Sequence, residues 1–318
     1  MIRTLLSGML VAGCAYGAKA VAQHYPDKPV RIITVGSDPA MPRILAQDLS
    51  STLGQQFYVE ERAGASGTIG AEVASRAPAD GYTLLVVTST HMVTPYFYKL
   101  SYNILRDFEP VSLMATSPFL LLAHPSLPVL TVRELIALVK ANPGRLNYSA
   151  TAAGSATMLP FEMFNSIAGI KIMHVPYKSV AAALIDAVAG QVPLVMSPAP
   201  SSLVQVTSGR LRALAVTTPK RTAALPNVPT FGEQSIPIAL SAWFGISVPA
   251  KTPPDIIARL NTEIVKAMRK PAIRERVLGL AMDPGENSPT EFTAFMKEDF
   301  LRWTEAVKVA RLDNEQKQ

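Results

Sequence analysis

Short apolar runs alternate with segments of helical periodicity along most of the chain. Residues 30–35 form a β-branched run that predicts a strand, and residues 39–53 place Ile44, Leu45 and Leu49 on one face of a predicted helix. Further strands are expected at 56–61, 82–88, 146–149, 171–174, 192–196 and 211–217, and further helices at 68–76, 158–167 and 180–189. This alternation predicts an α/β architecture.

Two capping boxes predict helix starts. Thr131 with Glu134, and Ser288 with Glu291, have the spacing in which a hydroxyl and a carboxylate each accept a hydrogen bond from the other residue's backbone N–H. Another helix is expected to begin at 252–255. The C-terminal segments have no strand partners in this pattern, so we expect them to pack against lobes formed by the rest of the chain.

The N-terminal segment, residues 1–22, has the pattern of an export signal. A basic start precedes an apolar run at 4–13, and small residues at 18–22 provide a cleavage site before Gln23. The residues that end at Cys14 offer an alternative, a lipoprotein box in which Cys14 is lipidated. The apolar run before Cys14 is short, so cleavage before Gln23 is favoured. The sequence therefore predicts a periplasmic protein, with a lipid anchor as the alternative.

Length and composition narrow the possible classes. The 318 residues suffice for two lobes with separate cores, since single cores stop growing at about 250–300 residues. The formal net charge is +6, but the basic residues are scattered, so a nucleic-acid partner is not expected. Cys14 is the only cysteine, which excludes disulfides and cysteine metal sites from the rest of the chain.

Common enzyme signatures are missing from the sequence. It contains no G-x-G-x-x-G, no G-x-x-x-x-G-K-[ST], no H-E-x-x-H and no G-x-S-x-G. His24, His91, His124 and His174 are isolated from one another and from carboxylates at metal-ligand spacing. We therefore expect no catalytic residues, no metal and no cofactor, although residues distant in sequence can still assemble a catalytic site.

Three predicted strands end in small, hydroxyl-bearing residues just before a helix. These candidate ligand-binding residues are Gly36, Ser37 and Asp38; Thr88, Ser89 and Thr90; and Ser149, Thr151, Gly154, Ser155 and Thr157. In open α/β sheets, ligands bind beyond the carboxyl ends of strands, where helix N-termini favour anions. The competing interpretation is that these residues only cap helices. Three such segments in one chain favour binding.

Four other places carry weaker signals. Asp186 lies in an apolar helix, where it either faces a ligand or, as we favour, ties a neighbouring loop. Ser197, after the strand at 192–196, is a further candidate ligand contact. Lys178 is expected to pair with an acid or to lie exposed. The glycine-rich stretch 64–70 could cradle an anion, but a tight turn into a helix is the commoner structure.

Several stretches together resemble the Bug-type solute receptors of tripartite tricarboxylate transporters. They occur in that family's order and extend over residues 25–311. The stretches are YPDKP (25–29), ADGYTLL (79–85), DFEPV (107–111), HVPYK (174–178), LRALAVT (211–217), LPNVPT (225–230) and RLN (259–261).

This resemblance implies a periplasmic-binding-protein fold of the type II kind, with two α/β lobes that close around a ligand cleft and are joined by crossover strands. By analogy, residues 23–122 form lobe 1, residues 246–318 return to it, and residues 123–245 form lobe 2. It also implies a small carboxylate ligand, delivery to integral-membrane permease subunits, and no enzymatic activity. We expect a monomer.

The first loop departs from the family pattern of Pro-Gly-Gly followed by Asp. Here Gly36, Ser37 and Asp38 precede Pro39, so Asp38 either caps the following helix or faces the cleft, where it would favour an amine or hydroxyl on the ligand. Two other functions remain open. The same fold could act as a ligand sensor for a signalling partner, or it could be an enzyme that uses Asp38, Lys178 or Asp186.

Overall fold

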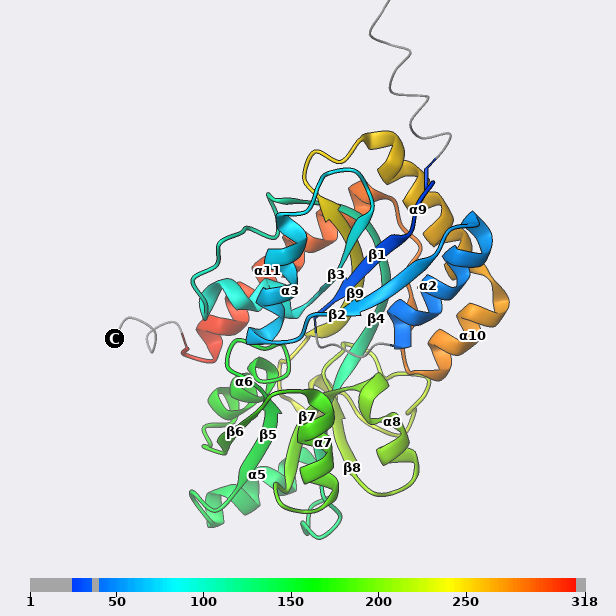
Figure 1. Cartoon of the computed structure of the whole chain (residues 1–318). Helices are drawn as coiled ribbons and strands as arrows, with labels where there is room; N and C mark the ends of the chain where they lie inside the picture. Colours follow the sequence, from blue (N-terminus) through cyan, green and yellow to red (C-terminus); the bar gives the residue numbers. More distant parts are fainter. Residues whose placement is uncertain (1–24, 36–39, 313–318) are drawn as a thin grey trace, which may run out of the picture.

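Two α/β lobes, joined by a pair of long strands, make up the part of the chain that the computed structural model describes, residues 25–35 and 40–312 (Figure 1). Three parallel strands form the first lobe in the order β2-β1-β3. They are β1 (Val30–Thr34), β2 (Phe57–Glu61) and β3 (Thr83–Thr88), connected by helices α2 (Ala40–Leu53) and α3 (Thr68–Ser75). All of β3 is buried, which explains its continuous apolar sequence.

The second lobe repeats this design lower in Figure 1, with β5 between β6 and β7 and parallel to both. Its strands are β5 (Asn147–Thr151), β6 (Met173–Tyr177), β7 (Leu194–Pro198) and β8 (Arg212–Val216). Its helices are α5 (Val132–Ala141), α6 (Leu159–Ala168), α7 (Val180–Val188) and α8 (Ala199–Thr207). Pro160 falls in the first turn of α6, where a missing N–H costs no helical hydrogen bond.

The two lobes are joined by β4 (Phe108–Ala123) and β9 (Ser241–Pro249), which run antiparallel. From Phe108 to Pro118, β4 pairs with β9 in the first lobe, whereas its last five residues pair with β7 and β8 in the second. One continuous strand therefore belongs to both sheets. The lobe boundaries predicted at 122/123 and 245/246 fall inside these strands, and that division of the chain stays a prediction.

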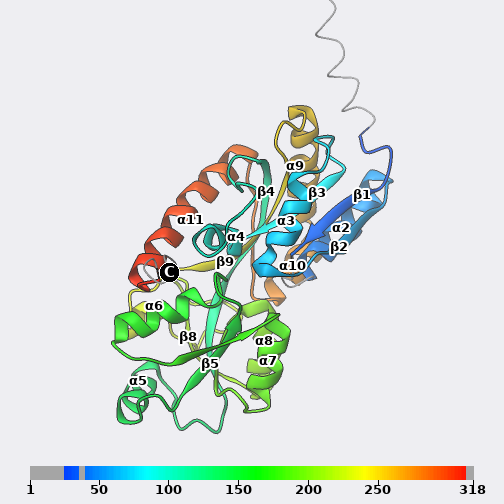
Figure 2. The same ribbon diagram turned by 60° about the vertical axis from the view of Figure 1, so that its left-hand side comes forward.

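The C-terminal region consists mainly of helices that cover the sheets. They are α9 (Pro254–Arg269), α10 (Pro271–Gly279) and α11 (Pro289–Val309). Helix α11 contacts α4 (Thr90–Val93), β4 and α6, so it touches both lobes (Figure 2). The expectation that this region lacks strand partners is wrong at one point, because β10 (Asp283–Pro284) pairs with β4.

Local sequence signals explain how several helices begin. Thr131 Oγ1 accepts the Glu134 N–H at 3.1 Å, and the Glu134 carboxylate accepts the Thr131 N–H at 3.2 Å. Ser288 and Glu291 make the same reciprocal pair at the start of α11. Both capping boxes are confirmed. Within the described residues, no helix is long and apolar enough to cross a membrane.

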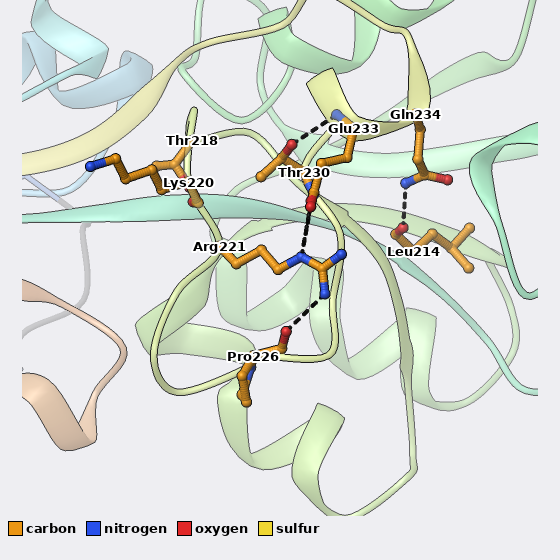
Figure 3. A network of polar contacts seen from close by, with 8 residues as sticks. All are labelled: Leu214, Thr218, Lys220, Arg221, Pro226, Thr230, Glu233 and Gln234. Carbon is orange, nitrogen blue, oxygen red and sulfur yellow. Dashed lines mark hydrogen bonds and ion pairs between the residues drawn. The ribbon is translucent and has the colours of Figure 1, made fainter.

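A polar network fixes the connection that leads from β8 to β9 (Figure 3). Arg221 Nε lies 3.0 Å from both carboxylate oxygens of Glu233, which also accepts the Thr230 N–H at 2.7 Å. Next to it, Gln234 Nε2 donates to the Leu214 carbonyl on β8 at 2.9 Å. These bonds hold the irregular segment that precedes β9 against the second lobe.

Gly245 on β9 leaves room for a ring of α11. A Cβ at Gly245 would lie 2.2 Å from Phe292 Cζ, and Phe292 is fully buried. We expect Gly245→Ala to lower the free energy of unfolding by about 1–3 kcal/mol, because the ring has nowhere to move. Urea denaturation measures the change. Gly279→Ala is the control, since nothing lies within 4 Å of a Cβ there. Equal stability of the two variants would contradict the close contact.

Candidate ligand-binding site

A cavity of about 500 Å³ lies between the lobes, at the carboxyl ends of their strands. Both lobes and both crossover strands supply its walls. The described residues that line it are Val35, Ala63, Gly64, Ala65, Ser66, Gly67, Thr88, Ser89, Thr90, Phe119, Thr151, Ala152, Ser155, Ala156, Thr157, Pro176, Tyr177, Lys178, Val180, Pro198, Ser201, Ala242, Trp243 and Phe244. Hydroxyls and apolar side chains dominate this set, and one member is charged.

The junction of β3 and α4 brings Thr88, Ser89 and Thr90 to the cleft. Behind them, His91 Nδ1 lies 3.1 Å from the Thr88 backbone nitrogen and accepts its N–H. This contact assigns the ring proton to Nε2, which is buried and has no hydrogen-bond partner among the described residues. Burial lowers the pKa of His91 to about 4. The imidazole is therefore neutral at neutral pH.

Three hydroxyls, one at the end of β5 and two in the β5–α6 loop, form a connected cluster. Thr157 Oγ1 lies 2.7 Å from Thr151 Oγ1 and 3.1 Å from Ser155 Oγ, and it accepts the Thr151 N–H. Ser155 Oγ also accepts the Met158 N–H in the turn that precedes α6. Among the described residues, no side chain caps α6 itself, whose N-cap residue is Met158. All three residues line the cleft, and each hydroxyl can make more than one hydrogen bond.

The turn before α3 has an unusual backbone. Gly64, Ala65, Ser66 and Gly67 have φ angles of 130°, 44°, 53° and 87°. Left-handed conformations at non-glycine residues cost of order 1–3 kcal/mol each and cluster at functional sites. The sequence favours a tight turn here and leaves an anion cradle as the rarer structure. The turn is present, and it lines the cleft.

The opposite wall comes from the end of β6. The Tyr177 hydroxyl donates to Asp186 Oδ2 at 2.5 Å, and this hydrogen bond raises the pKa of Tyr177 to about 12. Lys178 is exposed and is the only charged side chain among the described lining residues. No carboxylate of the described residues lies within ion-pair distance of Lys178. Its ammonium group is therefore free to meet an anion in the cleft.

Contacts between the lobes close one edge of the cavity. The Tyr98 hydroxyl donates to the Ala153 carbonyl at 2.9 Å, and Ser66 Oγ donates to the same carbonyl at 3.3 Å. Next to them, Gly154 packs closely against Phe97. A Cβ at position 154 would lie 2.6 Å from Phe97 Cβ, so only glycine fits there. The first lobe thus holds the β5–α6 loop of the second lobe, which begins directly after Thr151.

The family model described as "Tripartite tricarboxylate transporter family receptor" matches residues 41–312. The chain belongs to this receptor family. Protein BugT of Bordetella pertussis is 33% identical over 309 residues, which cover 95% of each chain. A protein in the tcbD-tcbE intergenic region of Pseudomonas sp. is 30% identical over 322 residues, covering 99% of this chain and 96% of that one.

Solved structures show the same fold. The R. palustris protein Rpa4515, solved with adipate, has a TM-score of 0.86 and 32% identity, and covers 90% of this chain and 98% of its own. MatC from Rhodopseudomonas palustris with bound malate has a TM-score of 0.84 and 27% identity over 89% and 100% of the two chains. The expected periplasmic-binding-protein fold and the Bug-type family are confirmed. The protein is a solute-binding receptor of this family.

In this receptor, six of the candidate residues named from the sequence meet at the cleft. They are Thr88, Ser89, Thr90, Thr151, Ser155 and Thr157. Four others lie outside the lining. Ser149 Oγ is 3.3 Å from the Ala183 and Leu194 carbonyls, Ser197 Oγ donates to the Pro198 carbonyl, Gly154 contacts Phe97, and Asp186 holds Tyr177. Gly36, Ser37, Asp38 and Cys14 lie outside the described residues.

The sequence interpretation missed Tyr177, Trp243 and the position of Lys178. Lys178 directly follows β6, a strand end that could have indicated the cleft, but only the fold brings it opposite Thr88. Within the described residues, no group of three or more His, Cys, Asp or Glu side chains could hold a metal ion.

Buried neutral His91 makes the receptor sensitive to acid. Its pKa is lowered from 6.5 to about 4 by burial, so the unfolded chain binds a proton more readily than the folded chain between these values. We expect unfolding free energy to fall as pH drops through this window, by about 3 kcal/mol from His91 alone. Urea denaturation from pH 7 to pH 4 should show this loss in the wild type and not in His91→Gln. Parallel pH profiles would contradict it.

Proposed function

We propose that this receptor binds a small organic carboxylate in the cleft and delivers it to permease subunits of a tripartite transporter. The main observation in support is Lys178, an unpaired cation among hydroxyl-bearing residues. The described lining of the cleft contains no carboxylate. Adipate and malate in the two similar R. palustris structures support the same ligand class. The bound acid is released unchanged, as the receptor character of the family suggests.

Closure of the lobes would strengthen the attraction between these groups and a bound anion. An ion pair in water is weak, whereas the same pair inside a closed cleft is screened much less. Hydroxyls such as those of Thr88 and Thr157 can donate hydrogen bonds to carboxylate oxygens. Binding of the negative charge therefore does not depend on Lys178 alone. The neutral His91 behind Thr88 adds no charge of either sign to this wall.

The export signal predicted at 1–22 and the family's transporter association support a periplasmic location. That segment and Cys14 lie outside the described residues, so cleavage before Gln23 and lipidation of Cys14 remain the two alternatives. A monomer suffices for this function, because both walls of the cleft come from one chain.

Thermal melting against a ligand panel tests the proposed function. The protein from Gln23 onward, refolded after denaturation to remove bound ligand, is melted with succinate, malate, adipate, benzoate and their neutral amides. A ligand that binds only the folded state raises the melting temperature. We expect a rise with at least one acid and none with its amide. A rise only with amides or amines would contradict the anion assignment, and recovery of a chemically altered acid would contradict release unchanged.

Replacing Lys178 removes the only cation from the described lining. We expect Lys178→Gln to weaken binding of the best acid about tenfold, the effect of a lost charge-assisted hydrogen bond that is partly open to solvent. Calorimetric titration measures the affinity. Lys140→Gln, which removes an exposed lysine from α5, is the matched control. An unchanged affinity in Lys178→Gln would show that the hydroxyls and backbone alone hold the acid.

A further inference from the structure

Both tryptophans of the chain donate to one oxygen of one buried carboxylate. Trp243 Nε1 lies 2.6 Å from Asp299 Oδ2, and Trp303 Nε1 lies 2.8 Å from the same oxygen. Asp299 is on α11 and is 3% exposed. A single acceptor atom thus orients both indole rings.

A carboxylate is a costly group at this position. Burial raises the pKa of Asp299, while the two indole hydrogen bonds and the nearby Arg302 act in the opposite direction. The closest approach of Arg302 is 3.7 Å, between its Nη1 and Asp299 Oδ1. Apolar residues of similar volume often replace buried charged groups without loss of stability. Stability alone therefore does not explain why a carboxylate lies at this buried position. Its role in orienting the two indole rings does explain it.

The two tryptophans support the part of the cleft that the crossover strands build. Trp243 lies on β9 among the residues that line the cleft, and its side chain is fully buried. Trp303 meets Phe119 edge-on, with ring centroids 6.3 Å apart and an interplanar angle of 89°. Phe119 lies on β4 and also lines the cleft. Asp299 itself is not part of the lining, but it holds one aromatic wall residue directly and supports another through Trp303.

Other contacts of Trp243 cannot replace this hydrogen bond. Phe292 and Phe295 meet its ring edge-on, with centroids 5.8 Å and 5.5 Å away. Such contacts hold the ring plane, but they do not decide which edge of the indole carries the N–H toward α11. Without an acceptor, the N–H would be buried and unpaired, and the ring would turn it toward water or a ligand oxygen in the cleft.

We propose that Asp299 is a positioning residue for the ligand. By holding Trp243, it fixes the floor of the cleft, meaning the part lined by Trp243 and Phe119. The position of this floor sets how long an apolar chain the bound acid can have. The inference rests on the proposed function and goes beyond it, because it assigns ligand selectivity to a residue outside the cleft.

Two substitutions of Asp299 separate its role in positioning the indole rings from the effect of its negative charge. Asp299→Asn keeps a carbonyl oxygen that can take the place of Oδ2 and accept both indole N–H groups. Asp299→Leu fills a similar volume and removes the acceptor. Leu260→Ala, at a fully buried site on α9 in a core cluster that contains neither tryptophan, is the control for loss of stability.

The measurement is the affinity of each variant for succinate, adipate and suberate, acids that differ only in chain length. We expect wild type and Asp299→Asn to prefer the same acid. In Asp299→Leu, the ratio between the best and the poorest acid should fall roughly tenfold. Leu260→Ala should melt at a lower temperature and keep the wild-type ratio. Tryptophan emission should shift in Asp299→Leu and not in Asp299→Asn, because both fluorophores contact this residue.

Several outcomes would overturn the proposal. A wild-type ratio retained in Asp299→Leu, or a ratio lost equally in Leu260→Ala, would show that Asp299 only stabilises the fold. Equal binding of all three acids by the wild type would show that the floor does not select for length. A wild type that binds none of them and no other acid of the panel would overturn the proposed function as well.

Discussion

Strand β4 constrains the whole structure, because its two ends belong to different sheets. Its first part pairs with β9, and its last five residues pair with β7 and β8. The lobes therefore cannot separate without breaking the hydrogen-bonded ladder of a buried strand. The cleft lies beside this junction, and its lining includes Phe119 and Trp243, which come from the two crossover strands and have buried side chains. Helix α11, which contacts both lobes, supports the junction from behind.

The candidate ligand-binding groups are divided between the lobes on either side of these strands. The first lobe supplies Thr88 to Thr90 and the strained turn that contains Ser66, while the second supplies the hydroxyl cluster around Thr157 and the ammonium group of Lys178. Neither lobe encloses an anion by itself. The Tyr98 contact with the Ala153 carbonyl links the two lobes, so the β5–α6 loop carries both candidate ligand-binding groups and a contact between the lobes.

Much of the regular structure follows from local sequence, and the rest depends on contacts between distant residues. The capping box at Thr131 and the hydroxyls after β3 and β5 were recognisable, because caps and strand ends are local features. Strands β4 and β9 were not located, since β4 contains Pro110 and Pro118 and has no alternation of polar and apolar residues. The cleft position of Lys178 and the pairing of Trp243 with Asp299 depend on how the lobes and α11 pack together. The hydrophobic periodicity of the sequence does not indicate this packing.

The central claim is that one ligand is held by loops of both lobes. Hydrogen exchange of the backbone amides, with and without the acid that most raises the melting temperature, tests it directly. The account predicts slower exchange in two separate segments, the β3–α4 junction around Thr88 and the β5–α6 loop around Thr157, together with the turn at Ser66. Protection confined to one lobe, or absent from both loops, would contradict a cleft site shared between the lobes.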